Sequence, residues 1–467
     1  MRLPVHLFRT LLPLILAAIA LSGSTRVATA DDLPPEIDLA PGPTNIVLIV
    51  ADDLGYGDLG CYGAPDVDSP VLDGLARSGI RFTQFYSNGP ECSPTRTALM
   101  TGRYQQRVGG LECAIGTHNV GRYDDAIRLA NEHQLGLPPT ENRLVRRLKD
   151  AGYTCGLFGK WHLGYEKHMW PLQQGFDRAF GCLGGNVDYF RHTENDGWNT
   201  LFDGDRLVEE DGYMTDLITD AALEWYQSVK NRPFFLYVPY TAPHSPIQVP
   251  GEDTGKLTPL DEWNRGPRHK YAAMVEHMDR GIGRILEALQ EDNLERNTLV
   301  IFMSDNGADA NGRNAPWTGN KGGLFEGGIR VPCIVRWPGR LPEGQVVNHP
   351  AITMDFTVSM LRAAEGQADE TGEFDGIDIL QQIEEDRPVG ERTLFWRARR
   401  GDRTWKAVRS GSLKRIWKQE GDRQQKWMFD LEADPREQQN LLDERPEDAR
   451  RLAELHAEWE QEVRAGR

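Results

Sequence analysis

The sequence predicts an α/β protein with a large α/β sandwich domain around a mostly parallel central sheet. A small C-terminal subdomain of antiparallel strands and a helix follows it. Short apolar runs typical of buried strands alternate with helical patterns through most of the chain, and such alternation is typical of a parallel sheet covered by helices. Beyond about residue 386 the pattern changes to more polar strands and a final helix. We therefore expect a large domain at 31–385 and a small subdomain at 386–467.

The N-terminus has the layout of a cleavable secretory signal peptide. Two arginines precede the apolar run 11–21, and the small-residue motif Ala28-Thr-Ala30 follows it. The apolar run is shorter than the roughly 20 residues that a membrane span requires. We therefore expect residues 1–30 to be removed, and the protein to be exported to the periplasm or secreted without a stable membrane anchor.

Two apolar runs end in pairs of oxygen-bearing side chains. The run 45–51 is followed by Asp52 and Asp53, and the run 298–304 by Asp305 and Asn306. Each run is typical of a buried parallel strand, and parallel strands deliver the residues after them to one edge of the sheet. Carboxylate and amide oxygens suit Ca²⁺ better than Zn²⁺, which prefers His and Cys ligands. Taken singly, each acidic strand end could also be a plain surface loop.

The remaining elements follow the same alternation. Helices are expected at 70–78, 141–151, 213–229, 271–290 and 354–364, and further strands at 153–158, 233–240 and 334–337. In the C-terminal subdomain we expect strands at 403–409 and 426–431 and an amphipathic helix at 446–465.

The segment Glu91-Cys92-Ser93-Pro94-Thr95-Arg96 predicts a short helix with a cysteine at its start. Proline favours the first helical turn, so we expect the helix to begin near Pro94 and to end at Gly102. Cys92 would lie at the positive end of the helix, where free N–H groups attract anions. Arg96, four residues along, projects from the same face. The alternative interpretation is a buried cysteine beside a helix start.

The pattern Cys-x-Pro-x-Arg of residues 92–96, continued by Thr101-Gly102-Arg103, resembles the signature of type I, formylglycine-dependent sulfatases. These arylsulfatase-like enzymes belong to the alkaline phosphatase superfamily. The resemblance implies that a formylglycine-generating or maturase enzyme oxidises Cys92 to formylglycine, whose hydrate is the nucleophile. One hydroxyl would attack sulfur, and the other would let the sulfated intermediate collapse, so one hard step becomes two easier ones. One Ca²⁺ per chain would be held by Asp52, Asp53, Cys92, Asp305 and Asn306.

Three further segments resemble sulfatase motifs. The segment 159–164 contains Lys160 and His162, the segment 241–246 contains His244, and the glycine-rich segment 319–330 contains Lys321. The resemblance implies that the two lysines bind sulfate. It also implies that His162, with Arg96, holds the nucleophile and that His244 contacts the sulfate ester. Either His244 or Lys321 would protonate the departing oxygen. Without the resemblance, a lone histidine in a loop would be interpreted as structural.

The net charge argues against a nucleic-acid partner, and the cysteine count limits the number of disulfides. The net charge is −17, and removing residues 1–30 takes away three arginines and no acids, giving −20. A chain this acidic with no basic run is not expected to bind nucleic acid. Of the six cysteines, conversion of Cys92 leaves five, so at most two disulfides can form.

The substrate is expected to be a sulfated small molecule or glycan, with a sulfated carbohydrate favoured. Candidate substrate contacts are Asn186, Asp188, Tyr189 and His192 in one segment, and Trp317 near Lys321. An ordinary surface loop and a packed tryptophan are the alternatives. Other possible functions are an aryl sulfatase and a phosphate or phosphonate monoester hydrolase, because fold alone does not separate them. A noncatalytic sulfated-glycan binder is a further alternative if Cys92 stays unconverted.

Overall fold

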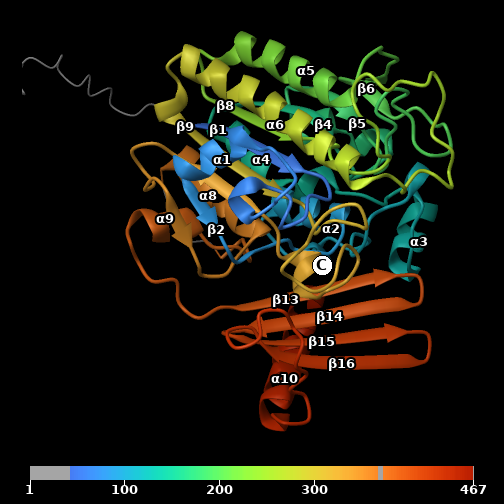
Figure 1. The fold of residues 1–467 in the computed structure, drawn as a ribbon, viewed down its shortest axis with the longest axis vertical. Coiled ribbons are helices and arrows are strands. Elements are labelled where there is room, and N and C mark those ends of the chain that lie inside the picture. Colours follow the sequence, from blue (N-terminus) through green and yellow to red (C-terminus); the bar gives the residue numbers. More distant parts are fainter. Residues whose placement is uncertain (1–42, 367–371, 466–467) are drawn as a thin grey trace, which may run out of the picture. The chain divides into compact units, whose positions relative to one another are not determined.

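A computed structural model describes residues 43–366 and 372–465 of the chain (Figure 1). The chain from Pro43 onward forms one compact unit. The expected signal peptide lies outside the described residues, and the domain boundary near residue 386 stays a prediction.

A ten-stranded sheet forms the centre of the large α/β body. Its strands in spatial order are β11 (Gln345–Val347), β2 (Ile80–Phe82), β10 (Cys333–Arg336), β9 (Thr298–Ser304), β1 (Asn45–Ala51), β8 (Phe234–Pro239), β4 (Thr154–Lys160), β5 (Arg178–Cys182), β6 (Leu201–Asp203) and β7 (Arg206–Leu207). The five strands from β9 to β5 are parallel, whereas β10, β6 and β7 run antiparallel to their neighbours. The mostly parallel sheet that the sequence predicts is therefore confirmed.

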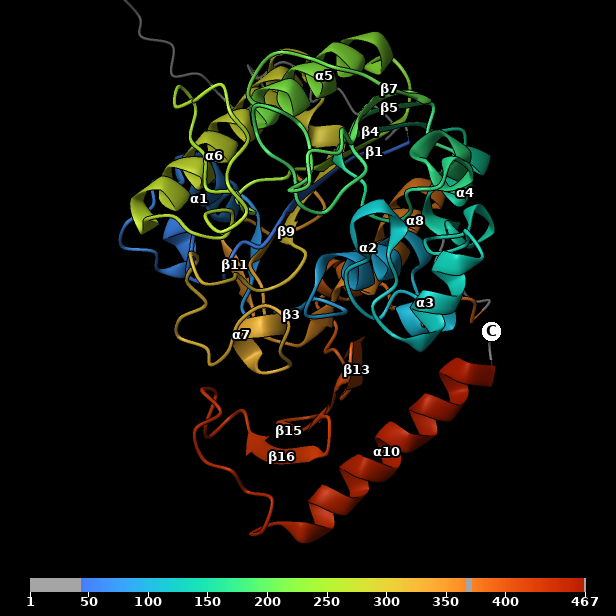
Figure 2. The ribbon, with the colours of Figure 1, turned by 90° about the vertical axis from the view of Figure 1, so that its right-hand side faces the viewer.

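Helices cover both faces of this sheet, as Figure 2 shows. One face is covered by α1 (Pro70–Arg77), α5 (Met214–Val229) and α6 (Arg268–Glu291), and the other by α2 (Cys92–Thr101), α4 (Arg143–Asp150) and α8 (Thr353–Glu365). Alternate residues of β1 pack against the two helical layers: Val47 and Ile49 face one core, and Ile46 and Leu48 face the other. A strand buried on both faces reads as a continuous apolar run, which is why β1 is visible in the sequence.

Smaller elements complete the large body. These are α3 (Asp124–Asn131), α7 (Glu326–Ile329), α9 (Ile379–Glu384) and a two-stranded parallel sheet of β3 (Phe85–Tyr86) and β12 (Ala351–Ile352).

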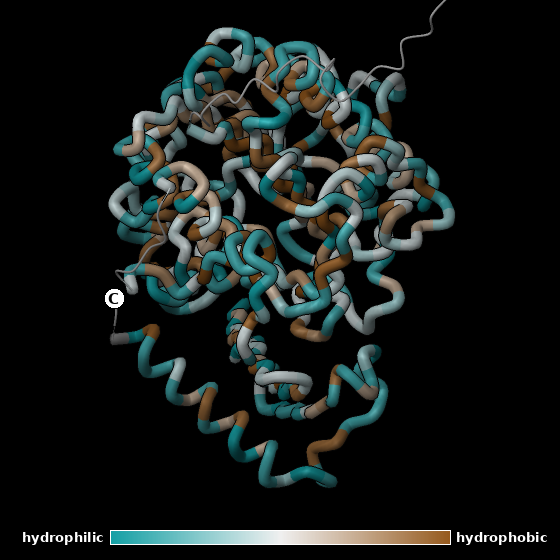
Figure 3. Tube along the Cα trace, turned by 90° about the vertical axis from the view of Figure 1, so that its left-hand side faces the viewer, coloured by the Kyte–Doolittle hydropathy of each residue, from teal (hydrophilic) through white to brown (hydrophobic). Residues whose placement is uncertain are grey.

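A second sheet lies at the C-terminal end. It is antiparallel, with strands β13 (Thr393–Arg400), β14 (Arg403–Ser410), β15 (Leu413–Glu420) and β16 (Arg423–Asp430), and it is followed by α10 (Pro446–Ala465). Trp396 and Ile416 of this sheet share an apolar cluster with Tyr86 and Ile329 of the large body. In Figure 3, hydrophobic residues are concentrated inside the large body, whereas α10 shows scattered hydrophobic positions among polar ones. This is the antiparallel subdomain that the sequence predicts.

The expected helices are observed with boundaries shifted by up to three residues, and one difference concerns the site. Helix α2 begins at Cys92, two residues before the expected start near Pro94. Pro94 is tolerated in this first turn because the first four N–H groups of a helix have no intrahelical acceptor. Cys92 is thus the first residue of the helix.

Two further observations concern the cysteines and the helices of the described residues. All six cysteines are free, so the described chain contains no disulfide. In the same residues, no helix is both long and apolar enough to cross a membrane.

Candidate active site

The parallel register of β1 and β9 brings the two acidic strand ends together. Ala51 pairs with Ser304, so the residues that follow each strand leave the sheet side by side. The Asp53 N–H donates to Asp305 Oδ1 at 3.3 Å, and Asn306 Nδ2 donates to Asp53 Oδ1 at 2.6 Å. Asp53 has a left-handed backbone with φ 62°, a conformation that non-glycine residues adopt rarely and often at functional sites.

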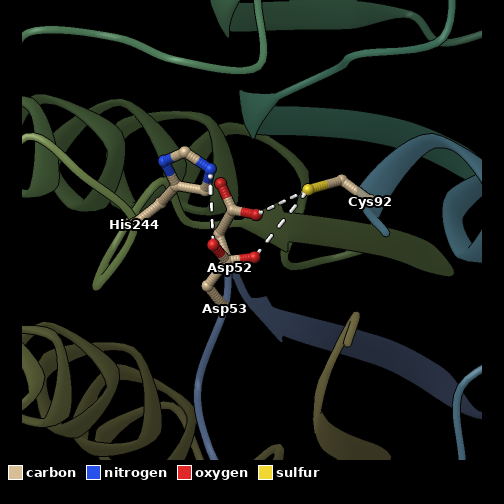
Figure 4. Close-up of side chains that lie close together, drawn as sticks. All are labelled: Asp52, Asp53, Cys92 and His244. Atoms are coloured by element: carbon tan, nitrogen blue, oxygen red, sulfur yellow. Dashed lines mark hydrogen bonds and ion pairs between the residues drawn. The ribbon is translucent and has the colours of Figure 1, made fainter. Parts of the chain in front are cut away.

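Cys92, at the start of α2, faces these carboxylates (Figure 4). Its Sγ lies 3.3 Å from Asp52 Oδ1 and 4.0 Å from Asp53 Oδ1. The residue is only 1% exposed. Burial, together with the charges of Asp305 and Asp52, raises the pKa of the Cys92 thiol well above its ordinary value. An unmodified cysteine here is therefore a neutral thiol and a weak nucleophile.

The side chains around Cys92 form a group that fits a hard cation. Ligand atoms of Asp52, Asp53, Cys92 and His244 all lie within 4.8 Å of one another. Asp305 and Asn306 contact Asp53 directly, and the Oδ1 of Asn306 is buried without a hydrogen-bond partner. Three carboxylates and an amide oxygen are the ligand types that Ca²⁺ prefers.

His244 is close to this group, but both of its ring nitrogens have other partners. Nδ1 donates to the Ser245 carbonyl at 2.8 Å, and Nε2 lies 2.9 Å from Lys321 Nζ. The arrangement therefore fits a cation with oxygen ligands better than a His-centred site such as zinc would need.

Two buried basic side chains, those of Lys160 and Arg96, pair with the carboxylates. Lys160, the last residue of β4, donates to Asp52 Oδ2 at 2.6 Å and to the Gly185 carbonyl at 3.0 Å. Arg96 Nε donates to Asp305 Oδ2 at 3.0 Å, and its Nη1 donates to the Lys160 carbonyl. Both side chains are 1% exposed. These contacts hold α2, β4 and the strand ends in one cluster, because a buried charge without its partner is costly.

His162 is held as a neutral imidazole with one free acceptor. Its Nε2 lies 3.0 Å from the Ile115 carbonyl, which can only accept, so Nε2 carries the proton. Its Nδ1 is buried and has no partner among the described residues. Burial and the charge of Lys160 lower the pKa of His162 well below its ordinary value. The ring can therefore accept a proton at Nδ1.

Lys321 and His244 form a second pair of basic side chains beside Asp53. We call this pair the cationic wall, because Lys321 carries a positive charge. Lys321 Nζ donates to Asp53 Oδ2 at 2.7 Å and contacts His244 Nε2. Burial and Lys321 lower the pKa of His244 to about 3, so the imidazole is neutral and accepts from the lysine. Burial opposes the charge of Lys321, but Asp53 and the neighbouring groups outweigh it and raise the lysine pKa. In the hydrogen bond between the two side chains, the proton is therefore on Lys321 Nζ and His244 Nε2 is the acceptor.

A cavity of about 100 Å³ opens onto this cluster. The sequence-predicted residues in its lining are Cys92, His162, His244, Lys321 and Asn186. Asp52, Asp53, Asp305, Asn306, Arg96 and Lys160 lie behind them through the contacts above. The structure thus brings the expected metal and nucleophile residues into one buried site.

The other expected substrate contacts are not in this lining. Asp188 Oδ1 accepts from the N–H groups of Phe190 and Arg191, so this side chain shapes its own turn. Tyr189 donates its hydroxyl to the carbonyls of Thr241 and His244, and His192 contacts the Gly212 carbonyl. Tyr189 therefore supports the His244 loop rather than facing the cavity.

Trp317 is also away from the lining. It packs edge-on against Tyr56, and the Arg330 guanidinium lies 3.9 Å from the centre of its ring.

Sequence reasoning missed several residues in the cavity lining. Arg122, Thr117 and Ile115 come from the loop before α3, Glu194 and Tyr165 from loops beside the sheet, and Arg400 from the end of β13. Glu194 accepts from the hydroxyls of Thr117 and Tyr165. Apart from Arg400, these residues lie outside the named α-helices and strands, and none belongs to a local motif, so only tertiary structure reveals them.

Comparisons with known proteins find matches in sequence and in fold. Residues 44–366 match the Sulfatase family. The N-acetylgalactosamine-6-sulfatase of Mus musculus is 35% identical over 399 residues, covering 81% of this chain and 73% of that protein. The steryl-sulfatase of Mus musculus is 31% identical over 490 residues, covering 85% of this chain and 75% of that protein.

Among solved structures, that of Ps i-CgsB is 30% identical with a TM-score of 0.78 and covers 90% of this chain and 93% of its own. Ps i-CgsB has also been solved in complex with k-i-k-neocarrahexaose.

Proposed function

Because this chain belongs to the sulfatase family and is a sulfuric ester hydrolase, we propose that it removes sulfate from a sulfated carbohydrate. We further propose that Cys92 acts as formylglycine and that the cation is Ca²⁺. These finer statements rest on the chemistry of the site residues.

The polar lining of the cavity is the observation that carries the carbohydrate proposal. Beyond Cys92 and the cationic wall, it presents the polar side chains of Arg122, Arg400, Thr117, Asn186 and Glu194. Tyr165 contributes a phenol ring, and the apolar side chains are those of Ala114 and Ile115. Sugar hydroxyls need hydrogen-bond partners of this kind, whereas an aryl or steroid sulfate would be matched by apolar and aromatic side chains. The carbohydrate names of two matched proteins, N-acetylgalactosamine-6-sulfatase and the neocarrahexaose-bound Ps i-CgsB, support the same choice.

The chain's own residues have distinct proposed tasks. Lys321 and His244 contact the sulfate oxygens, neutralise charge that develops there, and deliver a proton to the departing sugar oxygen through their shared hydrogen bond. His162, with its free Nδ1, accepts a proton from the attacking side. Arg96 and Lys160 fix the carboxylates that surround Cys92.

The remaining chemistry would come from the bound cation and from the formylglycine formed at residue 92. Ca²⁺, held by Asp52, Asp53, Asp305 and Asn306 with residue 92, would supply Lewis-acid charge, and formylglycine would supply the nucleophilic oxygen.

Maturation and export are part of the proposal. Because Cys92 is 1% exposed, a formylglycine-generating or maturase enzyme must reach it before the chain folds. Residues 1–30 have the signal-peptide pattern, so we propose that the protein is exported to the periplasm or secreted.

Sulfate release from a matched panel tests the function. The panel contains sulfated saccharides, an aryl sulfate and the phosphate counterpart of that aryl ester, each incubated with enzyme co-produced with a maturase. We expect the highest kcat/KM on one sulfated saccharide. Preference for the aryl sulfate would replace the carbohydrate by an aryl substrate. Phosphate release alone would overturn sulfate ester specificity, and binding of a glycan without any release would favour a noncatalytic binder.

Removal of the cation should abolish most activity. Chelation would leave three carboxylates around Cys92 without their cation, so we expect sulfate release to fall at least about 100-fold and to return on addition of Ca²⁺ but not Zn²⁺. Ca²⁺ titration should also raise the unfolding temperature, because a ligand of the native state stabilises it.

The variant Asn306→Ala should require a higher Ca²⁺ concentration for both effects. Recovery with Zn²⁺ alone, or full activity in the chelated enzyme, would contradict the calcium assignment.

A further inference from the structure

An unpaired arginine lies in the wall of the active-site cavity. Among the described residues, Arg122 has no ion pair and no side-chain hydrogen bond, and its Nε is buried without a partner. Most arginines near this site are compensated: Arg96 contacts Asp305, and Arg400 Nη1 contacts Glu91 Oε2 at 3.1 Å. A buried guanidinium donor without an acceptor carries a desolvation cost that a bound anion would relieve.

A second unsatisfied group lies in the same lining. The Oδ1 of Asn186 is buried and has no hydrogen-bond partner. The cavity therefore offers an unused acceptor and an unused cationic donor in addition to the residues around Cys92. The carboxyl group of Glu194 does not compensate Arg122, because it accepts from Thr117 and Tyr165 and forms no ion pair with the arginine.

The size of the cavity limits what can reach Arg122. At about 100 Å³ it is smaller than the roughly 300 Å³ at which pockets for drug-sized ligands begin. Only the end of a substrate fits, so a group that contacts Arg122 lies on the sugar that bears the scissile sulfate or on its immediate neighbour.

We propose that Arg122 selects substrates with a second anionic group, a carboxylate or another sulfate, beside the sulfate that is removed. This inference rests on the proposed function and names its substrate class more narrowly. The planar guanidinium pairs with either anion through two parallel N–H donors. Asn186 Oδ1 accepts from a hydroxyl or amide N–H of the same sugar. The substrate is thus a polyanionic glycan rather than a sparsely sulfated one.

Selectivity between matched saccharides tests the inference. The substrates are a monosulfated saccharide, its derivative with a second sulfate, and a derivative with a neighbouring uronate, measured with wild type and with Arg122→Gln. The selectivity is kcat/KM for each dianionic substrate divided by that for the monosulfated one. We expect Arg122→Gln to lower this ratio about 10- to 100-fold for the anion that Arg122 binds, because a charge-assisted hydrogen bond is lost.

The loss should appear mainly in KM, since the contact is the same in the ground state and in the transition state. Arg122→Lys should restore part of the ratio because it keeps the charge. Whichever of the two dianionic substrates loses its advantage identifies the anion as sulfate or carboxylate.

A matched control separates charge from position. Arg128, on α3, pairs with Asp125 and Glu132 and does not line the cavity, so Arg128→Gln should leave the ratio unchanged. An equal loss on all three substrates in Arg122→Gln would indicate a structural role for Arg122 and would overturn the inference, as would an unchanged ratio. If the wild type hydrolyses only the aryl sulfate, the proposed function fails instead.

Discussion

Replacement of Cys92 by alanine should reduce sulfate release to the level of the blank. We expect a loss of at least about 10⁴-fold in kcat, the scale seen when the nucleophile of a covalent enzyme is removed. The other groups of the site would still bind the ester, because Lys321 and His244 contact Asp53 and each other rather than Cys92. Initial rates of sulfate release, with binding of the same saccharide measured by calorimetry, check both parts.

Two further variants sharpen this result. Cys155→Ala removes another buried thiol, in strand β4 and outside the cavity lining, and should keep near wild-type turnover. Cys92→Ser, produced without a maturase, retains one hydroxyl but lacks the second hydroxyl that would let a sulfated enzyme collapse. We expect at most one turnover and a covalent sulfate ester visible by mass spectrometry. Sustained turnover of Cys92→Ala would refute the nucleophile assignment.

The central sheet could be predicted because its strands carry their own signal. β1 and β9 are buried on both faces, so each appears as an unbroken apolar run, and the polar residues after each run mark the active edge. Strands such as β6 and β7 have three and two residues, and no local pattern distinguishes them from loops. Their positions follow from the pairing of β6 with β5 and of β7 with β6, and the first of these is a tertiary contact.

Part of the site could be predicted because some of its residues occur in recognisable sequence motifs. Asp52, Cys92 and Lys321 occur in patterns that resemble a family motif, and the structure gathers them around one cavity. The segment 184–192 was expected to contact substrate, but backbone geometry directs Asp188 to its own turn and leaves Asn186 in the lining. Arg122 has no sequence signal, because an arginine without a partner is recognised only when its surroundings are known.

A buried three-residue cluster connects the Lys321 segment to the C-terminal sheet. Lys414 Nζ, on β15, donates to Glu326 Oε1 at 2.7 Å and to Glu437 Oε1 at 2.9 Å, and all three side chains are fully buried. Glu326 begins α7, five residues after Lys321, and its N–H donates to Glu437 Oε2 at 2.6 Å. This cluster therefore holds both the position of the C-terminal sheet and the end of the segment that delivers Lys321.

Replacement of Lys414 by methionine should give the largest loss of stability. The change leaves the buried carboxyl groups of Glu326 and Glu437 facing each other. Arg330 Nη1 still pairs with Glu326 Oε2 at 3.1 Å, but Glu437 loses its cationic partner, and we expect the free energy of unfolding to fall by about 3–5 kcal/mol. Chemical denaturation of the calcium-loaded protein measures it. As a control, Arg128→Met breaks two surface ion pairs and should cost less than about 1 kcal/mol. The double variant Lys414→Met/Glu437→Gln should recover at least about 1 kcal/mol, because the second carboxylate is also removed.

The pH dependence of this loss distinguishes an electrostatic cause from a packing defect. Burial raises the pKa of Glu437 to about 7 even though Lys414 opposes the shift, so without Lys414 the folded-state pKa rises further. Between the unfolded value near 4.5 and the raised folded value, the native state binds more protons than the unfolded state, and stability falls as pH rises. In wild type this fall ends near pH 7, where Glu437 ionises in the native state, whereas in Lys414→Met it continues up to the higher folded-state pKa. The deficit of the variant relative to wild type should therefore grow as the pH rises above about 7. A deficit that is constant over this range would show that methionine merely packs badly, and that the paired carboxylates do not need the lysine charge.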